Sequence, residues 1–406
     1  MSTKPLRKMP GAVPLSMLIA LVVACTGIAV QPDTAHAASS YYRTVTIDHT
    51  KAGSSNSTNF PILFNTTDAS FMTVGNGGKV QNASGYDVRF YSNVGLTTPL
   101  AFEIDSYNGT TGQYAAWVKI PTLSASVDTV IYVGYGDASI STSQEDVANT
   151  WDSNFKGVWH FRDGATLSVA NSIPGGIALT NSGGTASSSS MVGGGLALNG
   201  STQYVGNDTT TAFGDLPYTL EVWVNPSVSN ASGVLVGQNQ NTGGARGAEI
   251  NIRLNAVMRD HSVGSSATIN LDDTNTFTAN AWHYVSSVTS SATAYDIKLD
   301  NNAPTTGSTN VGSFSGMGNF EIGRRLAAGT GNNFAPKATY DEIRVSDSAR
   351  SADWRTATYN SISSPGTFYA LGSETASSVA ASAKRVLRLF AGFKIRLLKG
   401  RIRIGQ

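Results

Sequence analysis

Tyr218-Thr-Leu-Glu-Val-Trp-Val-Asn-Pro226 is the stretch of this 406-residue chain that says most about its fold. Aliphatic side chains stand at positions 220, 222 and 224, while positions 221, 223 and 225 carry polar or aromatic side chains. An alternation with a period of two residues is typical of a half-buried β-strand, because successive side chains point to opposite faces of a sheet. We therefore expect the aliphatic face of this strand to lie in a core.

The opposite face of this strand carries Glu221, Trp223 and Asn225, our candidate ligand-binding residues. If that face lies on an outer, concave sheet surface, the indole ring could stack on a sugar with polar neighbours beside it. The alternative is that both faces of the sheet are covered and Trp223 is a packing residue.

Eight further segments between residues 157 and 345 have the same short, strand-like character, separated by Gly, Asn and Ser. Many short strands with such breaks predict a two-sheet sandwich. The expected segments are 157–161, 193–200, 203–205, 248–253, 282–285, 295–299, 319–323 and 341–345.

The part of the chain before residue 137 forms a second all-β unit. Strand patterns occur at 42–48, 87–91, 115–121 and 129–135, with Gly and Asn clusters between them. No helical period of 3.6 residues is convincing here. The polar segment 137–151 is expected to be a hinge with at most one short helix.

Two sets of motifs in these units resemble known families. Leu198-Asn-Gly200, Leu220-Glu-Val-Trp-Val224, Trp282-His283 and Asp341-Glu-Ile-Arg344 resemble laminin-G-like domains, which are jelly rolls of the concanavalin-A-like lectin/glucanase type. Tyr86-Asp-Val-Arg-Phe90, Trp117-Val-Lys-Ile-Pro121 and Ile131-Tyr-Val-Gly-Tyr-Gly136 resemble a bacterial domain of unknown function that often precedes them. The resemblance implies an all-β protein of two tandem β-sandwich domains, 38–150 and 151–376, the second a jelly roll.

Residues 1–37 have the features of a secretory signal peptide. Basic residues at positions 4, 7 and 8 precede the apolar run 15–30, and Ala35-His-Ala37 supplies small residues of the kind found at a cleavage site. The run is short for a membrane span, which needs about 20 residues. We expect cleavage at Ala37 and a secreted, periplasmic or cell-surface protein. The alternatives are a lipoprotein acylated at Cys25, the single cysteine, and an uncleaved anchor.

The charge of the chain is unevenly distributed. Without residues 1–37 and 384–406, the chain has 17 basic and 26 acidic residues, a net charge of −9, although the whole chain carries +1. An acidic body repels phosphate groups, so we do not expect a nucleic-acid partner.

No arrangement of residues for hydrolysis is recognisable in the sequence. A glycosidase needs two carboxyl groups, about 5–5.5 Å apart in retaining enzymes and about 6.5–9.5 Å apart in inverting ones. The Glu-x-Asp-x-x-Glu strand of jelly-roll glucanases does not occur here. Glu103 and Asp105 share a strand face in the first domain, where we interpret them as turn-capping carboxylates. The adjacent residues Asp341 and Glu342 would face opposite sides of one strand.

Nucleophilic catalysis has no better support. The chain has no Gly-x-Ser-x-Gly motif, and its one cysteine lies in the leader. We interpret His160 and His283, each preceded by Trp, as structural histidines that bridge strands. The sequence therefore predicts a protein that is not an enzyme.

Calcium is the one metal that the laminin-G-like resemblance implies. Such domains sometimes bind it with loop carboxylates and carbonyl oxygens, ligands that suit a hard cation. Relatives often carry Asp in the loop after Leu198, but this chain has Asn199 there, which weakens the site because affinity follows ligand charge. We expect no cofactor; if calcium binds, Asn199 and Asp341 are the candidate ligands.

Residues 377–406 form an Ala/Ser linker followed by a tail with eight basic residues and no acidic ones. The tail fits an amphipathic helix or a hairpin that turns at Lys399-Gly400 and pairs Leu397 with Ile402 and Ile395 with Ile404. Either form could contact an anionic membrane or envelope component, or dock on the acidic body.

These features together predict an exported, non-catalytic binding protein. The expected partner is a carbohydrate or cell-surface glycan, recognised by the jelly-roll domain. A structural or adhesive protein-contact module of the cell envelope is the alternative, and a glycan hydrolase comes third.

Overall fold

The computed structural model describes residues 39–162, 166–239, 247–327 and 331–377, together with two strands at 394–398 and 401–405. The leader lies outside these residues, so cleavage at Ala37, acylation at Cys25 and export stay predictions. Among the described residues, no helix is both long and apolar enough to cross a membrane.

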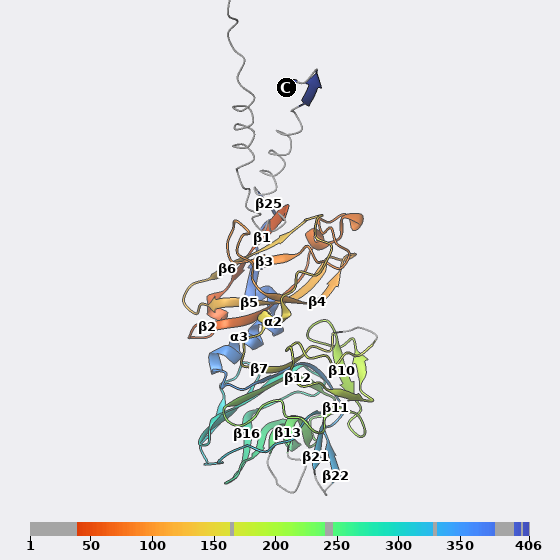
Figure 1. Ribbon diagram of the computed structural model, residues 1–406. Coiled ribbons are helices and arrows are strands. Elements are labelled where there is room, and N and C mark those ends of the chain that lie inside the picture. Colours follow the sequence, from red (N-terminus) through yellow and green to blue (C-terminus); the bar gives the residue numbers. More distant parts are fainter. Residues whose placement is uncertain are drawn as a thin grey trace, which may run out of the picture. The chain divides into compact units, whose positions relative to one another are not determined.

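The first domain consists of two antiparallel sheets (Figure 1). Five strands form one sheet: β24 (Tyr369–Leu371), β1 (Tyr41–Ile47), β6 (Thr129–Tyr135) and β3 (Arg89–Tyr91) in that order, with β25 (Thr375–Ala376) also paired to β1. The other contains β2 (Ser57–Thr67), β5 (Gln113–Leu123) and β4 (Phe102–Asn108) in that order. Short 3₁₀ turns, η1 (His49–Lys51), η2 (Ala69–Phe71) and η3 (Val74–Asn76), and the helix α2 (Val147–Thr150) lie between strands.

The two sheets of the second domain are larger. One runs β19 (Thr305–Gly307), β18 (Ala294–Leu299), β17 (His283–Ser291), β12 (Tyr218–Pro226), β23 (Ala338–Ser346), β10 (Gly195–Leu198) and β9 (Thr185–Ser187), with β7 (Phe155–Trp159) paired to β23. The other runs β16 (Thr268–Thr276), β15 (Val257–Val263), β14 (Gly247–Arg253), β13 (Gly233–Asn239), β20 (Asn319–Ile322), β11 (Tyr204–Asn207) and β8 (Thr180–Ser182). The pair β21 (Arg324–Ala327) and β22 (Gly331–Phe334) extends from β13, and η4 (Leu254–Ala256) joins β14 to β15.

The all-β fold class expected from the sequence is confirmed, as is the core face of β12. Leu220, Val222 and Val224 are fully buried and pack with residues of the facing sheet such as Ile250 and Ile322 in one hydrophobic cluster. Burying side chains of this size stabilises the fold by about 1.5–3 kcal/mol each. Trp223, on the opposite face of β12, is buried in a second hydrophobic cluster, so both faces of this strand lie inside the protein.

A charged group also lies inside the second sandwich. Asp260 of β15 is fully buried and accepts a hydrogen bond from the Ser262 hydroxyl at 2.6 Å, while its second carboxylate oxygen has no partner among the described residues. The hydroxyl of Tyr218 contacts the same serine at 3.1 Å. Burial raises the pKa of Asp260 to about 7, against the opposing effect of the hydrogen bond.

We expect Asp260 to make the protein less stable as the pH rises. The folded state holds this proton to about pH 7, whereas the unfolded chain releases it near pH 4. The folded state therefore loses stability between about pH 4 and 7, by up to roughly 4 kcal/mol. Urea unfolding at pH 5 and pH 8 checks this expectation: Asp260→Asn should show a smaller loss between the two pH values than the wild type. An equal loss in both proteins would contradict it.

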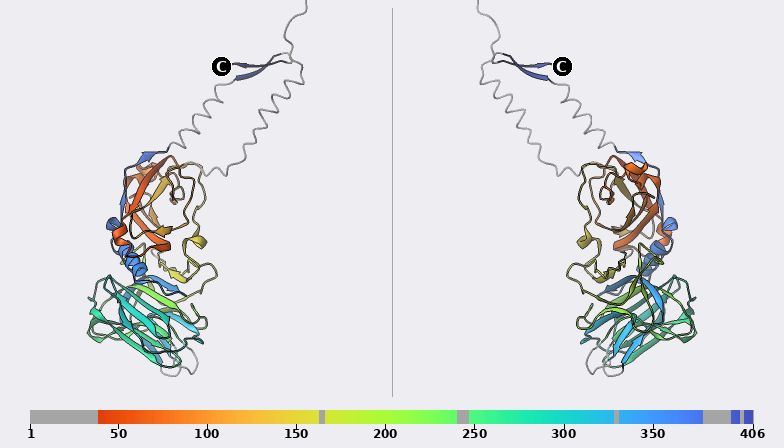
Figure 2. Two further views of the ribbon diagram at one scale, coloured as in Figure 1. Left: turned by 90° about the vertical axis from the view of Figure 1, so that its left-hand side faces the viewer. Right: turned by 90° about the vertical axis from the view of Figure 1, so that its right-hand side faces the viewer.

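The helix α3 (Ala352–Ser363) lies between the two domains (Figures 1 and 2). Ser351 caps its first turn by accepting a hydrogen bond from the Trp354 amide at 3.1 Å. Toward the first domain, Trp354 contacts Phe60 of β2 with ring centroids 4.7 Å apart. Toward the second, the Arg355 guanidinium donates two hydrogen bonds to Asp296 of β18. This helix therefore joins the domains rather than belonging to one of them.

The chain after α3 returns to the first domain, which corrects the expected boundary. The short helix α4 (Pro365–Phe368) brings β24 and β25 alongside β1, where Val45 pairs with Leu371 and Tyr41 with Ala376. Assigning all of 151–376 to the second domain was therefore wrong. The sheet edge at β1 recruits these strands because its backbone groups would otherwise lack partners.

The basic tail contains an antiparallel hairpin of β26 (Lys394–Leu398) and β27 (Arg401–Gly405). Leu397 pairs with Ile402 and Ile395 with Ile404, the register of the hairpin alternative. Contact of this tail with an anionic surface stays a prediction.

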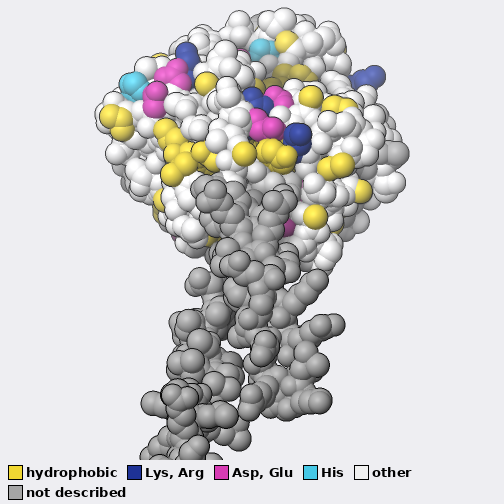
Figure 3. All heavy atoms as spheres, turned by 90° about the horizontal axis from the view of Figure 1, so that it is seen from above, with side chains coloured by type: hydrophobic (Ala, Val, Ile, Leu, Met, Phe, Trp, Pro, Cys, Tyr) yellow, Lys and Arg dark blue, Asp and Glu magenta, His cyan; other side chains and the backbone are white. Residues whose placement is uncertain are grey.

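Charged residues make up only 14% of the chain. Figure 3 shows one face of the first domain, on which Lys, Arg, Asp and Glu are few and uncharged polar groups and backbone cover most of the area. Hydroxyl and amide groups thus provide much of the solvation of this face.

Candidate functional site

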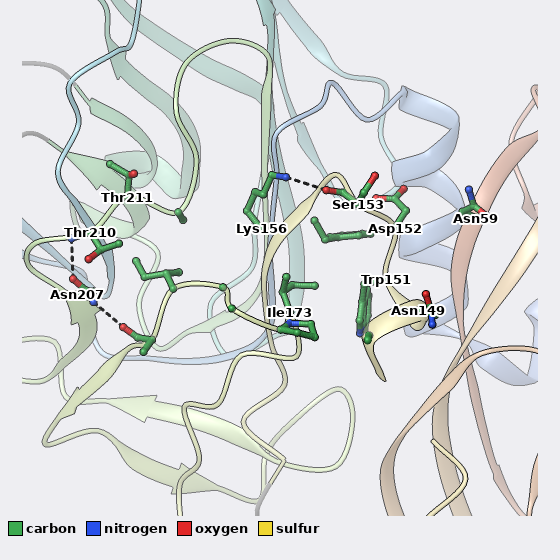
Figure 4. Close-up of a pocket in the computed structure, with 18 of the residues that line it drawn as sticks. Asn59, Asn149, Trp151, Asp152, Ser153, Lys156, Ile173, Asn207, Thr210 and Thr211 are labelled. Atoms are coloured by element: carbon green, nitrogen blue, oxygen red, sulfur yellow. Dashed lines mark hydrogen bonds between the residues drawn. The ribbon is translucent and has the colours of Figure 1, made fainter. Parts of the chain in front are cut away.

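A cleft with a volume of about 900 Å³ lies where the two domains meet. Strands β2 and β5 of the first domain contribute Asn59 and Lys119, and the segment from α2 to β7 forms the middle. The loop before β8 and the segment from Asn207 to Ala212 belong to the second domain. Figure 4 shows Asn59 and Asn149 at one end, Trp151 and Ile173 in the middle, and Asn207, Thr210 and Thr211 at the other end.

Several polar side chains in this cleft are free to bind a ligand. Among the described residues, the side chains of Asn59, Lys119, Thr210 and Thr211 make no hydrogen bond or ion pair. Asn59 has a positive φ of 53° within β2 and no partner in the β2–β5 register. At this local irregularity of the strand the Asn59 side chain is exposed to solvent. Asn is among the few residues that tolerate this conformation.

The charged groups of the cleft are mostly neutralised by partners. Asp152 accepts two hydrogen bonds from Arg350, at 2.6 and 2.7 Å. Lys156 pairs with Asp347 at 2.8 Å and also donates to the Ser153 carbonyl. The cleft therefore presents amides, hydroxyls and one unpaired amine, with apolar surface from residues such as Ile173 and Pro174.

A smaller cavity of about 370 Å³ adjoins this cleft, and Pro174 lines both. Glu103, His160 and Arg162 line it together with hydroxyl and amide side chains. Glu103 comes from β4 of the first domain, and His160 directly follows β7 of the second. The cavity thus borders a buried group of charges shared by the two domains.

We call the residues Glu103, Asp105, His160, Arg162, Asp341, Glu342 and Arg344 the junction cluster. His160 Nδ1 lies 2.7 Å from Glu342 Oε1 and 3.9 Å from Asp105 Oδ2, and its Nε2 lies 3.6 Å from Glu103 Oε2. Arg162 pairs with Glu103 at 2.8 Å, and Arg344 pairs with Glu342 at 3.0 Å.

Aromatic rings enclose the cluster. The Trp117 ring stacks on the His160 ring with centroids 5.7 Å apart, and the Arg344 guanidinium lies 4.3 Å from the Trp117 ring. The Trp151 indole N–H donates to Glu103 at 2.7 Å. These rings exclude water, which strengthens electrostatic interactions between the buried groups.

The mutual proximity of these groups shifts their pKa values. Burial alone would raise the pKa of Glu103, but the charges of His160 and Arg162 and the hydrogen bonds lower it to about 2. Burial would likewise lower the pKa of His160, yet Glu342 and Glu103 outweigh burial and raise it to about 10. Burial raises the pKa of Asp105 to about 7, because no hydrogen bond stabilises its charged form.

Local backbone features place the carboxylates. A bulge in β23 opposite Val222 shifts the register, and Glu342 within it has a φ of +48°. Bulges redirect side chains, which is why Asp341 and Glu342 are both buried next to one another. At Gly193, φ is +55°, and a Cβ atom there would lie 2.1 Å from Asp105 Oδ1, so this close approach requires glycine.

The candidate ligand-binding face of β12 is not on the surface. Glu221 and Trp223 are 1% and 2% exposed, and Asn225 is half-buried. The Tyr284 hydroxyl donates to Glu221, and the Trp223 ring stacks on Tyr359 of α3 with centroids 5.6 Å apart. The expectation of an exposed, concave platform was therefore wrong, because α3 covers this face, and the packing alternative describes Trp223.

The two candidate calcium ligands do not form one site. Asn199 is exposed and caps a turn, accepting hydrogen bonds from the amides of Ser201 and Thr202 at 3.0 Å. Asp341 is fully buried and accepts from the amides of Met191 and Val192. In the pairing of β10 with β23, Leu198 lies opposite Ala338, so Asp341 lies three residues farther along β23.

The interpretation of Glu103 and Asp105 made from the sequence missed the junction cluster. Glu103 and Asp105 are not turn caps, since Glu103 is bonded to Trp151, Arg162 and Ser172 and Asp105 faces His160. His283 does bridge parts of its own domain, through Asp300 at 2.8 Å and Thr278. The i, i+2 spacing of two carboxylates was the available signal, but their partners lie 48 or more residues away.

The fold and the cleft define a class of protein: two tandem all-β domains with a polar cleft at their junction. The family model for a domain of unknown function, DUF2341, matches residues 84–169, in agreement with the resemblance of the first domain. No curated protein matches the chain.

Several solved structures are distantly similar. One is domain 4 of AbnA, an extracellular arabinanase from Geobacillus stearothermophilus, in complex with arabinotriose (13% identity, 51% of this chain, 98% of that chain, TM-score 0.40). Another is the botulinum neurotoxin serotype G binding domain (12% identity, 51% of this chain, 50% of that chain, TM-score 0.40). A third is Trypanosoma rangeli sialidase in complex with sialic acid (13% identity, 64% of this chain, 44% of that chain, TM-score 0.40). At these identities and TM-scores the likeness assigns no function to this chain.

Proposed function

We propose that this protein binds a neutral oligosaccharide in the cleft between its domains. One observation carries the proposal: four side chains with unused hydrogen-bonding groups, Asn59 and Lys119 from the first domain and Thr210 and Thr211 from the second, line a single cleft. Sugars present hydroxyl groups that both donate and accept hydrogen bonds, and amides, hydroxyls and an amine match them.

The size and the mixed lining of the cleft support the same ligand class. Its volume of about 900 Å³ lies within the ordinary range for ligand sites, roughly 300–1,000 Å³. Ile173 and Pro174 offer apolar surface on which the C–H face of a sugar ring can rest. A strongly anionic ligand fits less well, because Lys119 is the one unpaired cation among the residues that line this cleft.

Binding without cleavage is the second part of the proposal. Glycoside hydrolysis generally requires two carboxyl groups at the scissile bond. Asp152 is the one carboxylate among the residues lining this cleft, and Arg350 holds both of its oxygens. We therefore expect no release of reducing sugar from a glycan that binds.

A glycan array followed by calorimetry on the best ligand tests this function. Asn59→Gly combined with Thr211→Val should raise the dissociation constant by about tenfold or more, since each lost hydrogen bond contributes about 0.5–1.5 kcal/mol. Glycine suits the positive φ at position 59, and valine matches the shape of threonine. The unfolding free energy should change little, because neither side chain makes a contact that stabilises the fold.

The matched control is Asn301→Gly with Thr306→Val, two exposed residues without side-chain hydrogen bonds elsewhere in the second domain. It should bind like the wild type. Failure to bind any glycan, or equal weakening in both double variants, would overturn the cleft as a glycan site and favour the protein-contact alternative. Turnover of a bound glycan would overturn the non-catalytic part alone.

A further inference from the structure

The junction cluster contains a buried carboxylate that accepts no hydrogen bond from the described chain. The Asp105 side chain is completely buried, and neither of its oxygens has a hydrogen-bond donor. The Nε2 atom of His160 also lacks a hydrogen-bond partner. Buried polar atoms without partners are costly and in native proteins commonly mark a bound water or ion.

The geometry around Asp105 has the dimensions of a metal site. One ligand atom each from Asp105, His160 and Glu342 lies within 4.8 Å of the other two. The His160 Nδ1 atom is 2.7 Å from Glu342 Oε1 and 3.9 Å from Asp105 Oδ2. Tetrahedral zinc, with bonds of about 2.0–2.2 Å, places its ligand atoms about 3.3–3.6 Å apart, between these two distances.

The surroundings also supply a carboxylate that faces the second ring nitrogen of His160, as is usual for a metal-bound histidine. If Nδ1 binds an ion, Nε2 carries the proton and faces Glu103 Oε2 at 3.6 Å, and a carboxylate commonly orients the second nitrogen of a ligating histidine. The adjoining cavity of about 370 Å³, which His160 and Glu103 line, offers an entry route and room for a water ligand.

We propose that Asp105, His160 and Glu342 bind one divalent metal ion of the zinc type, and that this ion links the two domains. An imidazole ligand suits zinc and its transition-metal neighbours, whereas calcium prefers oxygen ligands throughout. Asp105 comes from β4 of the first domain, Glu342 comes from β23 of the second, and His160 directly follows β7. This site is distinct from the candidate calcium ligand Asn199 and from the glycan cleft.

Zinc content of the full chain tests the site. The protein is stripped with EDTA, dialysed against excess zinc chloride and then against buffer, and its metal is measured by mass spectrometry, with affinity from competition with a chromogenic chelator. We expect one zinc ion per chain and a higher urea midpoint with zinc than without it. Asp105→Asn should weaken zinc binding at least about 100-fold while the far-UV circular dichroism stays that of the wild type.

Two variants serve as controls. Asp260→Asn removes an equally buried carboxylate in the other core, and Asp128→Asn disrupts Asp48, His49 and Asp128, the exposed second group with metal-like spacing. Both should retain the zinc. If Asp105→Asn does not fold, the zinc content of the wild type and of Asp128→Asn tests the proposal instead. Zinc in both supports the site, whereas a wild type without zinc, or zinc lost through Asp128→Asn, overturns it.

Discussion

Replacing Trp223 with alanine is expected to destabilise the protein by about 3–5 kcal/mol, the usual cost of removing a buried indole. The ring is 2% exposed and lies between Tyr284 and Tyr359, each with a ring centroid 5.6 Å away. Its loss leaves a cavity where β12 meets α3, so the helix that joins the two domains loses packing contacts with the second domain. Urea unfolding followed by tryptophan fluorescence and circular dichroism measures the effect.

Asn225→Ala is the matched control, because Asn225 lies on the same face of the same strand but is half-buried and makes no side-chain hydrogen bond. It should change the unfolding free energy by less than about 1 kcal/mol. If Trp223→Ala were as stable as the wild type and bound glycan more weakly, Trp223 would be the surface platform that its position in the sequence suggests. The buried position in the structure would then be incorrect.

A chain that ends at Ser364 is expected to lose the folded first domain. It lacks α4, β24 and β25, and with them Phe368 and Tyr369, which are buried in the core of that domain. The Tyr369 hydroxyl also bonds the backbone amide and carbonyl of Asn65, at 2.9 and 2.8 Å. Losing two large aromatic side chains and a strand costs more than about 5 kcal/mol, comparable with the whole stability of a typical domain.

Limited proteolysis with mass spectrometry locates the damage. Cleavage should concentrate between residues 41 and 135 in the chain ending at Ser364. A chain ending at Ser377 keeps every strand of the sheet that contains β1 and should resist protease like the full-length protein. Equal resistance of the two truncated chains would show that the first domain folds without its C-terminal strands.

Several strands could be predicted because their side chains alternate. Residues 129–135 and 218–226 are strands β6 and β12 with the predicted bounds. Strands without alternation were missed: every residue of β13 (Gly233–Asn239) is buried, so its two faces carry no contrast in polarity. Side chains alternate with a period of two only where one face of a strand meets water and the other meets the core. The alternation is absent where protein covers both faces.

The helix α3 was missed for a related reason. Its buried residues alternate between apolar ones (Trp354, Ala357, Ile362) and polar ones (Arg355, Thr358, Ser361), so its covered face shows no continuous apolar stripe in the sequence. The guanidinium of Arg355 donates to Asp296, which is 59 residues away, and such a distant partner cannot be recognised from the sequence around the helix. This helix determines that Trp223 is a core residue, so missing the helix led directly to the wrong ligand-binding face.

By itself, the pattern of side chains along the chain determined that the protein is all-β and which face of β12 enters the sandwich core. These properties depend on neighbours in sequence, whose spacing decides which side of a strand meets water. Only the tertiary structure decided that α3 covers the other face, that β24 and β25 return to the first domain, and that Glu103, Asp105, His160 and Glu342 come together. Those contacts join residues as far apart as Tyr41 and Ala376, and the burial of charge in the junction cluster exists only once the two domains have packed.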